Sequence, residues 1–483
     1  MSLKEKSISS MLWTLAEGFG TQGTSFIVSI ILTRVLLPAD FGLIGMIAIF
    51  MTMGYSLIDS GLSSSLIRTK NASQIDYSTV FFINIIGSLL IYALIYLTAP
   101  LIAKFYNQVV LVDLIRVYSI GFIITAFTAI QQTRLTKELN FKVQLFIRMP
   151  SIVISGIFGI IMAHNGFGVW SLVYMYLINQ ILSSIQFWWV SKWTPSFIFD
   201  FDVLQKHLNF GYKITLSGLL NTLFSNIHHV IIGRMYSVDL LGFYTRSIML
   251  KKYPVTNLSS ALNKVTFPLF SQIQDDPIRL KKAYKKLMQL VVFIVAPMMI
   301  GAAVLAEPLF ITLFTEKWVP AVPFFQIMCI SGILYPLHSY NLNILKVFGR
   351  SDLFLKLEVV KKGILLITVA MTMWWGIIPM LIGQVIDSYL AYWINSRYSG
   401  KFINYPAKEQ LSDVIGSFVL AIVMGGLIFL LDLFIFKNQH DLLRVILGFL
   451  IGATSYYLMS KSFKIEAFFE MQLIMKSKIK RFR

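Results

Sequence analysis

The sequence has few charged residues and a single cysteine. Only 13% of its 483 residues are Asp, Glu, Lys or Arg, about half the share found in soluble globular proteins. The one cysteine, Cys329, excludes an internal disulfide. No polar stretch is long enough to form an extramembrane domain. These absences argue against a soluble protein and against a small disulfide-stabilised one.

The sequence also lacks the short motifs of common catalytic sites. It contains no GxxxxGK[ST] phosphate-binding loop, no His/Cys cluster with metal-ligand spacing and no credible Ser/His/Asp arrangement. ATP-driven transport by this chain itself is therefore excluded. We expect a protein that is not an enzyme and that has no metal or organic cofactor.

Long apolar blocks are what the sequence has instead. Hydrophobic residues make up 56% of the chain, and its mean hydropathy is +0.71. The segments 85–102 and 414–436 can each cross a hydrocarbon core of about 30 Å as a helix. The first block, 11–37, is longer than the apolar core of a signal peptide and contains Glu17, so we interpret it as a retained span. The predicted fold class is an all-α polytopic membrane protein.

The apolar blocks and the charges between them predict the topology. We expect about 14 spans, near 11–35, 41–66, 78–102, 113–135, 145–164, 167–190, 210–233, 241–270, 286–306, 320–347, 354–376, 377–396, 412–436 and 441–460. Lys and Arg concentrate in alternate connections, which marks these as cytoplasmic and predicts that both termini are cytoplasmic. The net charge of +19 is then explained by topology and by attraction to lipid headgroups, without a nucleic-acid partner.

A short segment occurs twice and indicates an internal repeat. "TRVLLPADFG" (33–42) follows the first span and "GRMYSVDLLG" (233–242) follows the seventh, and in each an arginine precedes a glycine by eight residues. The later segments "APLIAKFY" and "AEPLFITLF", and "YSIGFI" and "CISGIL", pair in the same order. Because six spans is an even number, the halves should be parallel repeats related by an axis along the membrane normal.

The repeat predicts two six-helix lobes. The expected divisions are an N-lobe over 1–196, an interfacial linker helix over 197–209, a C-lobe over 210–400, and over 401–483 two extra spans with a basic cytoplasmic tail.

Polar residues at membrane depth are the candidates for binding, because they are costly there unless they face a cavity or a partner. In span 8, Arg246 and Lys264 are about five helical turns apart and share a face with Tyr253 and Asn257. The alternative is that both cations lie near the span ends and reach toward headgroups. In span 7 the candidates are Lys213, Ser217, Asn221 and His228, with hydrogen bonding between helices as the alternative for His228.

Two carboxylates in the first spans, Glu17 and Asp59, have two interpretations. They could bind a coupling Na+ or H+, or they could pair internally with Arg148 or Arg116. The later acids Asp387 and Asp432 are expected to be structural. A polar cavity that is richer in cations on its second-half side would suit an anionic, sugar-bearing substrate.

Several segments resemble a known family. "ILTRVLLPADFGLIGMIAIF", "LIDSGLSSSLIRTK" and "GFYTRSIMLKKYPVTNLSSALNKVTFPLFSQIQ" are similar to the bacterial polysaccharide transporters, the oligosaccharide flippases of the MOP exporter superfamily, of the lipopolysaccharide or colanic-acid type. The resemblance implies alternating access between two lobes and transfer of a polyprenyl-pyrophosphate-linked oligosaccharide, such as an O-antigen, capsule or exopolysaccharide precursor, across the bacterial inner membrane. It also implies that Arg246 and Lys264 contact the pyrophosphate, and that glycan polymerases and glycosyltransferases are partners.

Two other functions remain open at this point. A cation-coupled antiporter of the multidrug and toxin extrusion type would share the architecture but would need a more acidic cavity. A membrane scaffold for glycan-assembly enzymes would tolerate charge reversal at Arg246 and Lys264.

Overall fold

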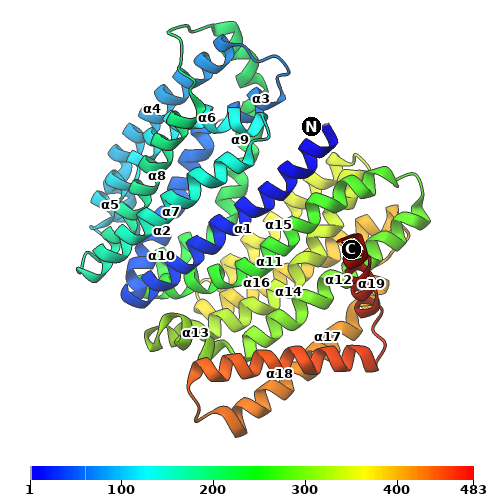
Figure 1. The fold of residues 1–483 in the computed structure, drawn as a ribbon. Coiled ribbons are helices and arrows are strands. Elements are labelled where there is room, and N and C mark those ends of the chain that lie inside the picture. The colour runs from blue at the N-terminus through cyan, green and yellow to red at the C-terminus, as the bar shows by residue number, and fades with distance from the viewer. Residues whose placement is uncertain (1–2, 60, 483) are drawn as a thin grey trace. The chain divides into compact units, whose positions relative to one another are not determined.

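The computed structural model describes residues 3–59 and 61–482, and these residues form helices and connecting turns without a β-strand (Figure 1). The chain divides into two compact units, 1–242 and 243–483. The crossing from one unit to the other falls inside a single helix, α11 (Val238–Gln272). The lobe divisions at 197–209 and at 400 that the repeat suggests stay predictions.

The first unit contains ten complete helices among its described residues. They are α1 (Leu3–Val35), α2 (Pro38–Asp59), α3 (Leu62–Arg68), α4 (Gln74–Tyr106), α5 (Leu111–Tyr118), α6 (Ile120–Lys137), α7 (Phe141–His164), α8 (Val169–Ser191), α9 (Phe201–Ser225) and α10 (Ile227–Met235). The predicted linker at 197–209 includes non-helical residues up to Asp200 and the first turns of α9, which continues unbroken to Ser225.

The second unit contains most of α11 and the remaining helices of the described chain. These are α12 (Pro277–Val304), α13 (Ala306–Phe314), a 3-10 turn (Glu316–Ala321), α14 (Val322–Val347), α15 (Ser351–Thr372), α16 (Ile377–Phe402), α17 (Ala407–Leu431), a π-helical turn (Asp432–Phe436), α18 (Asp441–Ser462) and α19 (Glu466–Phe482). Its core includes fully buried Tyr244, Trp318 and Tyr340.

Every predicted span coincides with a helix or with two consecutive helices. The helices of some predicted spans are much more apolar than those of others. Nine stretches within the described residues are long and apolar enough to cross a membrane. The other predicted spans correspond to α1, α8, α9 with α10, α11 and α15, which have the length but are more polar. Most of the candidate site residues lie on these polar helices. The multi-pass helical fold is confirmed, and the total number of spans stays a prediction.

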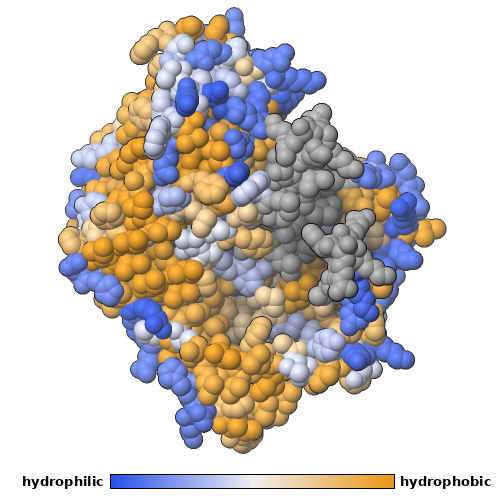
Figure 2. All heavy atoms as spheres, viewed as in Figure 1, coloured by the Kyte–Doolittle hydropathy of each residue, from blue (hydrophilic) through white to orange (hydrophobic). Residues whose placement is uncertain are grey.

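The outer surface of each unit is strongly apolar, as expected for contact with lipid. Leu97 on α4 is 74% exposed and Phe449 on α18 is 70% exposed. In the space-filling view, apolar residues cover broad areas over the helices of the first unit and over α17 and α18, and hydrophilic residues gather toward helix ends (Figure 2). A surface of this kind is stable only in a membrane.

The repeated segment has the same local structure in both copies. α1 ends at Val35 and α2 begins at Pro38, while α10 ends at Met235 and α11 begins at Val238. In the first copy the Leu37 N–H donates to Asp40 Oδ2 at 2.9 Å. In the second copy the Leu240 N–H donates to Ser237 Oγ at 3.3 Å. Each copy therefore uses one of the two bonds that together make a capping box.

The glycines of the repeated segment bring its two copies into contact. A Cβ added at Gly42 would lie 2.0 Å from the Val238 carbonyl oxygen, and one added at Gly242 would lie 2.0 Å from the Pro38 carbonyl oxygen. The starts of α2 and α11 thus pack against each other reciprocally, each through its glycine. Such an exchange of equivalent contacts is the geometry of a local twofold axis.

Candidate functional site

The polar interior of the second unit is built around α11. Arg246 is buried, at 9% exposure, and its Nη1 atom lies 3.1 Å from the Met249 sulfur. Tyr253 lies two turns further along α11, within about 20° of Arg246 around the helix. The structure therefore brings together two members of the predicted stripe. Asn257 and Lys264 lie on α11, but their side chains are outside the described residues.

One further cation, Lys251, belongs to this interior, and the sequence reasoning missed it together with its exposed neighbour Lys252. Lys251 on α11 donates to Ser331 Oγ on α14 at 3.4 Å, and Lys252 follows it directly. His338 on α14 lies within electrostatic reach of Lys251 and of Lys361 on α15. The signal in the sequence was the pair "KK" at 251–252 inside a predicted span.

Few carboxylates balance these cations. Lys361 pairs with Glu358 at 2.5 Å, and Asp387 accepts a hydrogen bond from Thr368 at 2.7 Å. In the part of the chain that the structure describes, Lys251 forms no ion pair. Since a cation at membrane depth is costly without a compensating anion, Lys251 can bind an anionic ligand.

The candidates of span 7 are divided between two helices. Ser217 and Asn221 are exposed on α9, whereas His228 is buried on α10. A turn at Asn226 separates the two helices, so the predicted stripe does not follow one uninterrupted helix. The side chain of Lys213 lies outside the described residues.

The acidic candidate of the first span has an internal partner. Glu17 on α1 lies 3.2 Å from Arg148 on α7, with side-chain exposures of 12% and 35%. Arg116 instead packs on the Tyr96 ring at 4.2 Å. The side chain of Asp59 is outside the described residues. For Glu17, internal pairing is thus present, while ion coupling stays a prediction.

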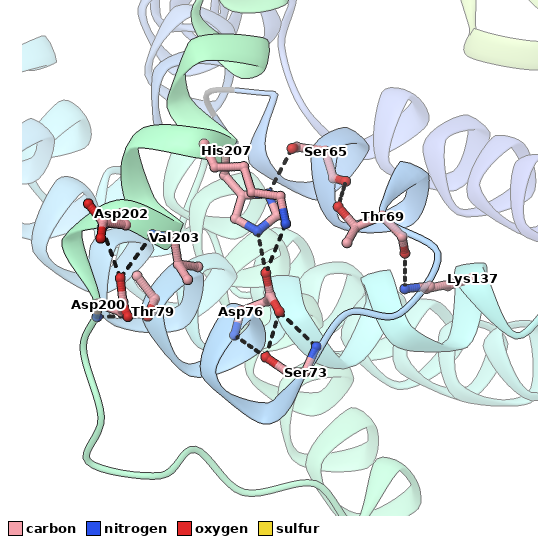
Figure 3. Close-up of polar contacts among 11 residues, drawn as sticks. Ser65, Thr69, Ser73, Asp76, Thr79, Lys137, Asp200, Asp202, Val203 and His207 are labelled. Atoms are coloured by element: carbon pink, nitrogen blue, oxygen red, sulfur yellow. Dashed lines mark hydrogen bonds and ion pairs between the residues drawn. The ribbon is translucent and has the colours of Figure 1, made fainter.

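A buried polar cluster joins α3, α4 and α9 at one end of the first unit (Figure 3). His207 Nδ1 lies 2.7 Å from Ser65 Oγ, and His207 Nε2 lies 3.0 Å from Asp76 Oδ1. The three residue types of a hydrolytic triad thus meet here, although they are far apart in the sequence. His207 is fully buried and its two partners are 6% exposed, so no substrate reaches the hydroxyl, and the cluster acts as a structural clasp.

Neighbouring contacts strengthen this clasp. Ser73 caps α4 and shares a capping box with Asp76, so one carboxylate serves both the helix start and His207. Gly211 lies on α9, one turn after His207. A Cβ added at Gly61, where φ is +65°, would lie 2.8 Å from the Gly211 backbone. Only glycine permits this backbone approach. The clasp therefore fixes the start of α9 to the first unit.

The second unit also contains an apolar pocket of about 350 Å³ between α12, α13, α17 and α18. Gly301, Gly448 and Gly452 form part of its wall, together with Met298, Leu309 and Phe449. Small residues leave room beside a helix backbone, and the pocket suits a hydrocarbon chain.

The arrangement of helices is similar to that of solved multi-pass membrane proteins. The structure matches the lipid II flippase MurJ in an inward closed conformation with a TM-score of 0.74 at 15% identity, over 94% of this chain and 99% of that one. It also matches an inward-facing multidrug resistance transporter of the MATE family, in the MOP superfamily, with a TM-score of 0.58 at 17% identity, over 79% and 96% of the two chains. At these identities the likeness establishes the fold.

Sequence comparison identifies the family. A family model described as polysaccharide biosynthesis protein matches residues 31–323, and the chain belongs to this family. The teichuronic acid biosynthesis protein TuaB of Bacillus subtilis is 30% identical over 305 residues, 62% of each chain. The lipopolysaccharide biosynthesis protein WzxC of Escherichia coli is 24% identical over 441 residues, 88% of this chain and 90% of that one. The resemblance to a family of bacterial polysaccharide proteins is confirmed, and the fold is one that a transporter of the MOP superfamily also has.

Proposed function

We propose that the protein is a flippase that moves a polyprenyl-pyrophosphate-linked oligosaccharide, a precursor of a cell-surface polysaccharide, across the bacterial inner membrane. Membership of the polysaccharide biosynthesis family supports this proposal. So do the match to WzxC over most of both chains and the fold shared with a lipid II flippase. Transfer proceeds by alternating access between the two lobes, with both termini in the cytoplasm.

The observation that carries the proposal is the cationic interior on α11. Arg246 is buried in the second unit, and Lys251 reaches Ser331 inside the same unit. Guanidinium and ammonium groups bind phosphate oxygens, and Tyr253 offers a hydroxyl for sugars. We assign the pyrophosphate to Arg246, Lys251 and Lys252. Asn257 and Lys264, whose side chains lie outside the described residues, remain candidates for this site from the sequence.

The driving force is a second part of the proposal. Glu17 and Asp59 are candidates for binding Na+ or H+, and Glu17 would exchange Arg148 for the coupling cation. Glycan polymerases and glycosyltransferases would supply and consume the lipid-linked substrate, and these enzymes are the proposed partners.

The charges of the interior disfavour a cation-exporting antiporter. Such a transporter needs carboxylates that are free to bind a cationic drug, whereas Glu17 already contacts Arg148 and Glu358 already contacts Lys361. Resistance to cationic drugs that falls on deletion of the gene, with unchanged surface glycan, would favour the antiporter.

Deletion of the gene followed by extraction of polyprenyl-linked lipids tests the proposal. We expect accumulation of a cytoplasm-facing lipid-linked glycan and loss of the surface polysaccharide. Complementation with the double variant Lys251→Gln/Lys252→Gln should lower export by about a hundredfold, because each of the two lost phosphate contacts costs about 1.5 kcal/mol. The matched control Lys104→Gln/Lys437→Gln removes the same charge from exposed positions and should export normally. Unaltered glycan and no lipid intermediate after deletion would rule out a flippase, and full export by the Lys251 and Lys252 variant would fit a scaffold.

A further inference from the structure

Two adjoining hollows lie at the C-terminal end of α16, in the second unit. The larger, of about 750 Å³, is lined by the end of α16, the following turn and the start of α17, among them Trp393, Arg397, Lys401, Pro406 and Lys408. The smaller, of about 380 Å³, lies against α15 and is lined among others by Lys356, Arg397, Tyr398 and Lys401. Arg397 and Lys401 line both hollows.

Four cations from three helices converge there. Arg397 and Lys401 are one helical turn apart on α16, Lys356 comes from α15, and Lys408 comes from α17. All four side chains are exposed. Throughout residues 3–59 and 61–482, no hydrogen bond or ion pair engages any of these four side chains. The hollows therefore hold four positive charges without a protein counter-ion.

The nearby acids are committed elsewhere. Glu409 pairs with Lys281 at 2.8 Å, and Asp413 pairs with Lys285 at 2.7 Å. Asp413 also accepts a hydrogen bond of 2.5 Å from the Tyr405 hydroxyl, and burial raises the pKa of Tyr405, so this hydroxyl remains a donor. The α17 carboxylates are thus held by α12 and by the turn, and are not available to neutralise the hollows.

The start of α17 adds a further attraction for anions. This helix has 25 residues and begins at Ala407 after Pro406, with no side-chain cap. Both residues line the larger hollow. The N-terminus of a helix carries a partial positive charge and unsatisfied N–H groups, which favour phosphate. Trp393 and Tyr398 are residues typical of the membrane–water interface.

We propose that these hollows bind the phosphate of a membrane lipid, at a site separate from the α11 residues assigned to the transported substrate. The phosphate belongs to an anionic phospholipid of the bilayer or to a polyprenyl pyrophosphate, and the recognition chemistry is the same for both. The lipid tail lies along the apolar exterior of α15 and α16, where Val359 and Ile386 are 61% and 50% exposed. The proposal concerns binding and does not depend on the proposed transport activity.

The test measures lipid binding by the purified full-length protein. In one arm the protein is placed in phosphatidylcholine nanodiscs with increasing phosphatidylglycerol, and in the other it is titrated with undecaprenyl pyrophosphate in detergent. The variant is Arg397→Gln/Lys401→Gln. The matched control is Lys70→Gln/Lys464→Gln, which removes two exposed charges outside the hollows. Thermal unfolding in pure phosphatidylcholine confirms that both variants are folded.

We expect the Arg397 and Lys401 variant to lose about thirtyfold in affinity, because each cation near a phosphate surface contributes about 1 kcal/mol. A loss in the phosphatidylglycerol arm supports the site with a bilayer phospholipid as its ligand. A loss confined to the polyprenyl arm supports it with a substrate-type lipid. Equal affinities for this variant and the control in both arms would overturn the proposal.

Discussion

Alanine at Gly42 should test the reciprocal contact between the starts of α2 and α11. The added Cβ would lie 2.0 Å from the Val238 carbonyl oxygen and 2.8 Å from its Cγ1 atom. Non-bonded carbon contacts are favourable at about 3.5–4.0 Å, so the two helix starts must separate by more than about 1 Å. Because the nearest atom is backbone, no side-chain rotation can relieve the clash.

The magnitude follows from two opposing effects. Overpacking costs about 1–3 kcal/mol, and a rigid backbone obstacle places this change near the upper end. Replacing a helical glycine by alanine stabilises the helix by about 1 kcal/mol. The net destabilisation is about 2 kcal/mol, which lowers the melting temperature by about 4–8 °C for a unit of this size. Gly242→Ala should behave in the same way, since its Cβ meets the Pro38 carbonyl at the same distance.

The assay is thermal unfolding of the purified protein in detergent, followed by size-exclusion chromatography. Gly87→Ala is the matched control, because a Cβ there meets no atom within 4 Å and only the helix-propensity gain remains. The double variant Gly42→Ala/Gly242→Ala should cost less than the sum of the single variants, because one separation of the helix starts relieves both clashes. If Gly42→Ala melts at the same temperature as Gly87→Ala, the reciprocal contact is not present.

Two further predictions concern the polar contacts of the first unit. Glu17→Gln should lower the unfolding free energy by about 1–2 kcal/mol, since Arg148 is only partly buried and water screens the loss. The exchanged pair Glu17→Arg/Arg148→Glu should recover most of the lost unfolding free energy in the same melting assay. The pairing would be contradicted if Glu17→Gln left the melting temperature unchanged and the exchanged pair lowered it. His207→Ala should cost about 3 kcal/mol, because it leaves the buried Ser65 and Asp76 without their partner. It should also make the 194–200 connection a site of rapid proteolysis, while unchanged melting and protease resistance would show that the clasp has no role in stability.

The helical architecture could be predicted because membrane spans are specified locally. Apolar runs indicate where the spans lie, and prolines and capping residues mark where helices begin, as at Pro38 and Ser237. Each copy of the repeated segment follows a predicted span, and in the structure each joins the end of one helix to the start of the next, at α1–α2 and at α10–α11. The packing of its two glycines against each other could not be inferred, because the contacts join residues about 200 positions apart.

The polar interior was only partly predictable for a related reason. The helical period of span 8 places Arg246 on a polar stripe. Lys251 is about 140° away from Arg246 around an ideal helix, so it does not belong to that stripe. Its place in the interior depends on Ser331 of another helix. The clasp was missed because His207 lies 131 residues from Asp76 and 142 from Ser65. Periodicity identifies which face of a helix is polar, whereas tertiary packing decides which polar groups meet.

The clasp also affects how the protein can be made in the cell. A nascent chain that ends before α9 contains Ser65 and Asp76 but still lacks His207. The first unit therefore reaches its final set of buried hydrogen bonds only after α9 has left the ribosome. Until then the Ser65 hydroxyl and the Asp76 carboxylate lack their histidine partner, so this end of the first unit is completed late in synthesis.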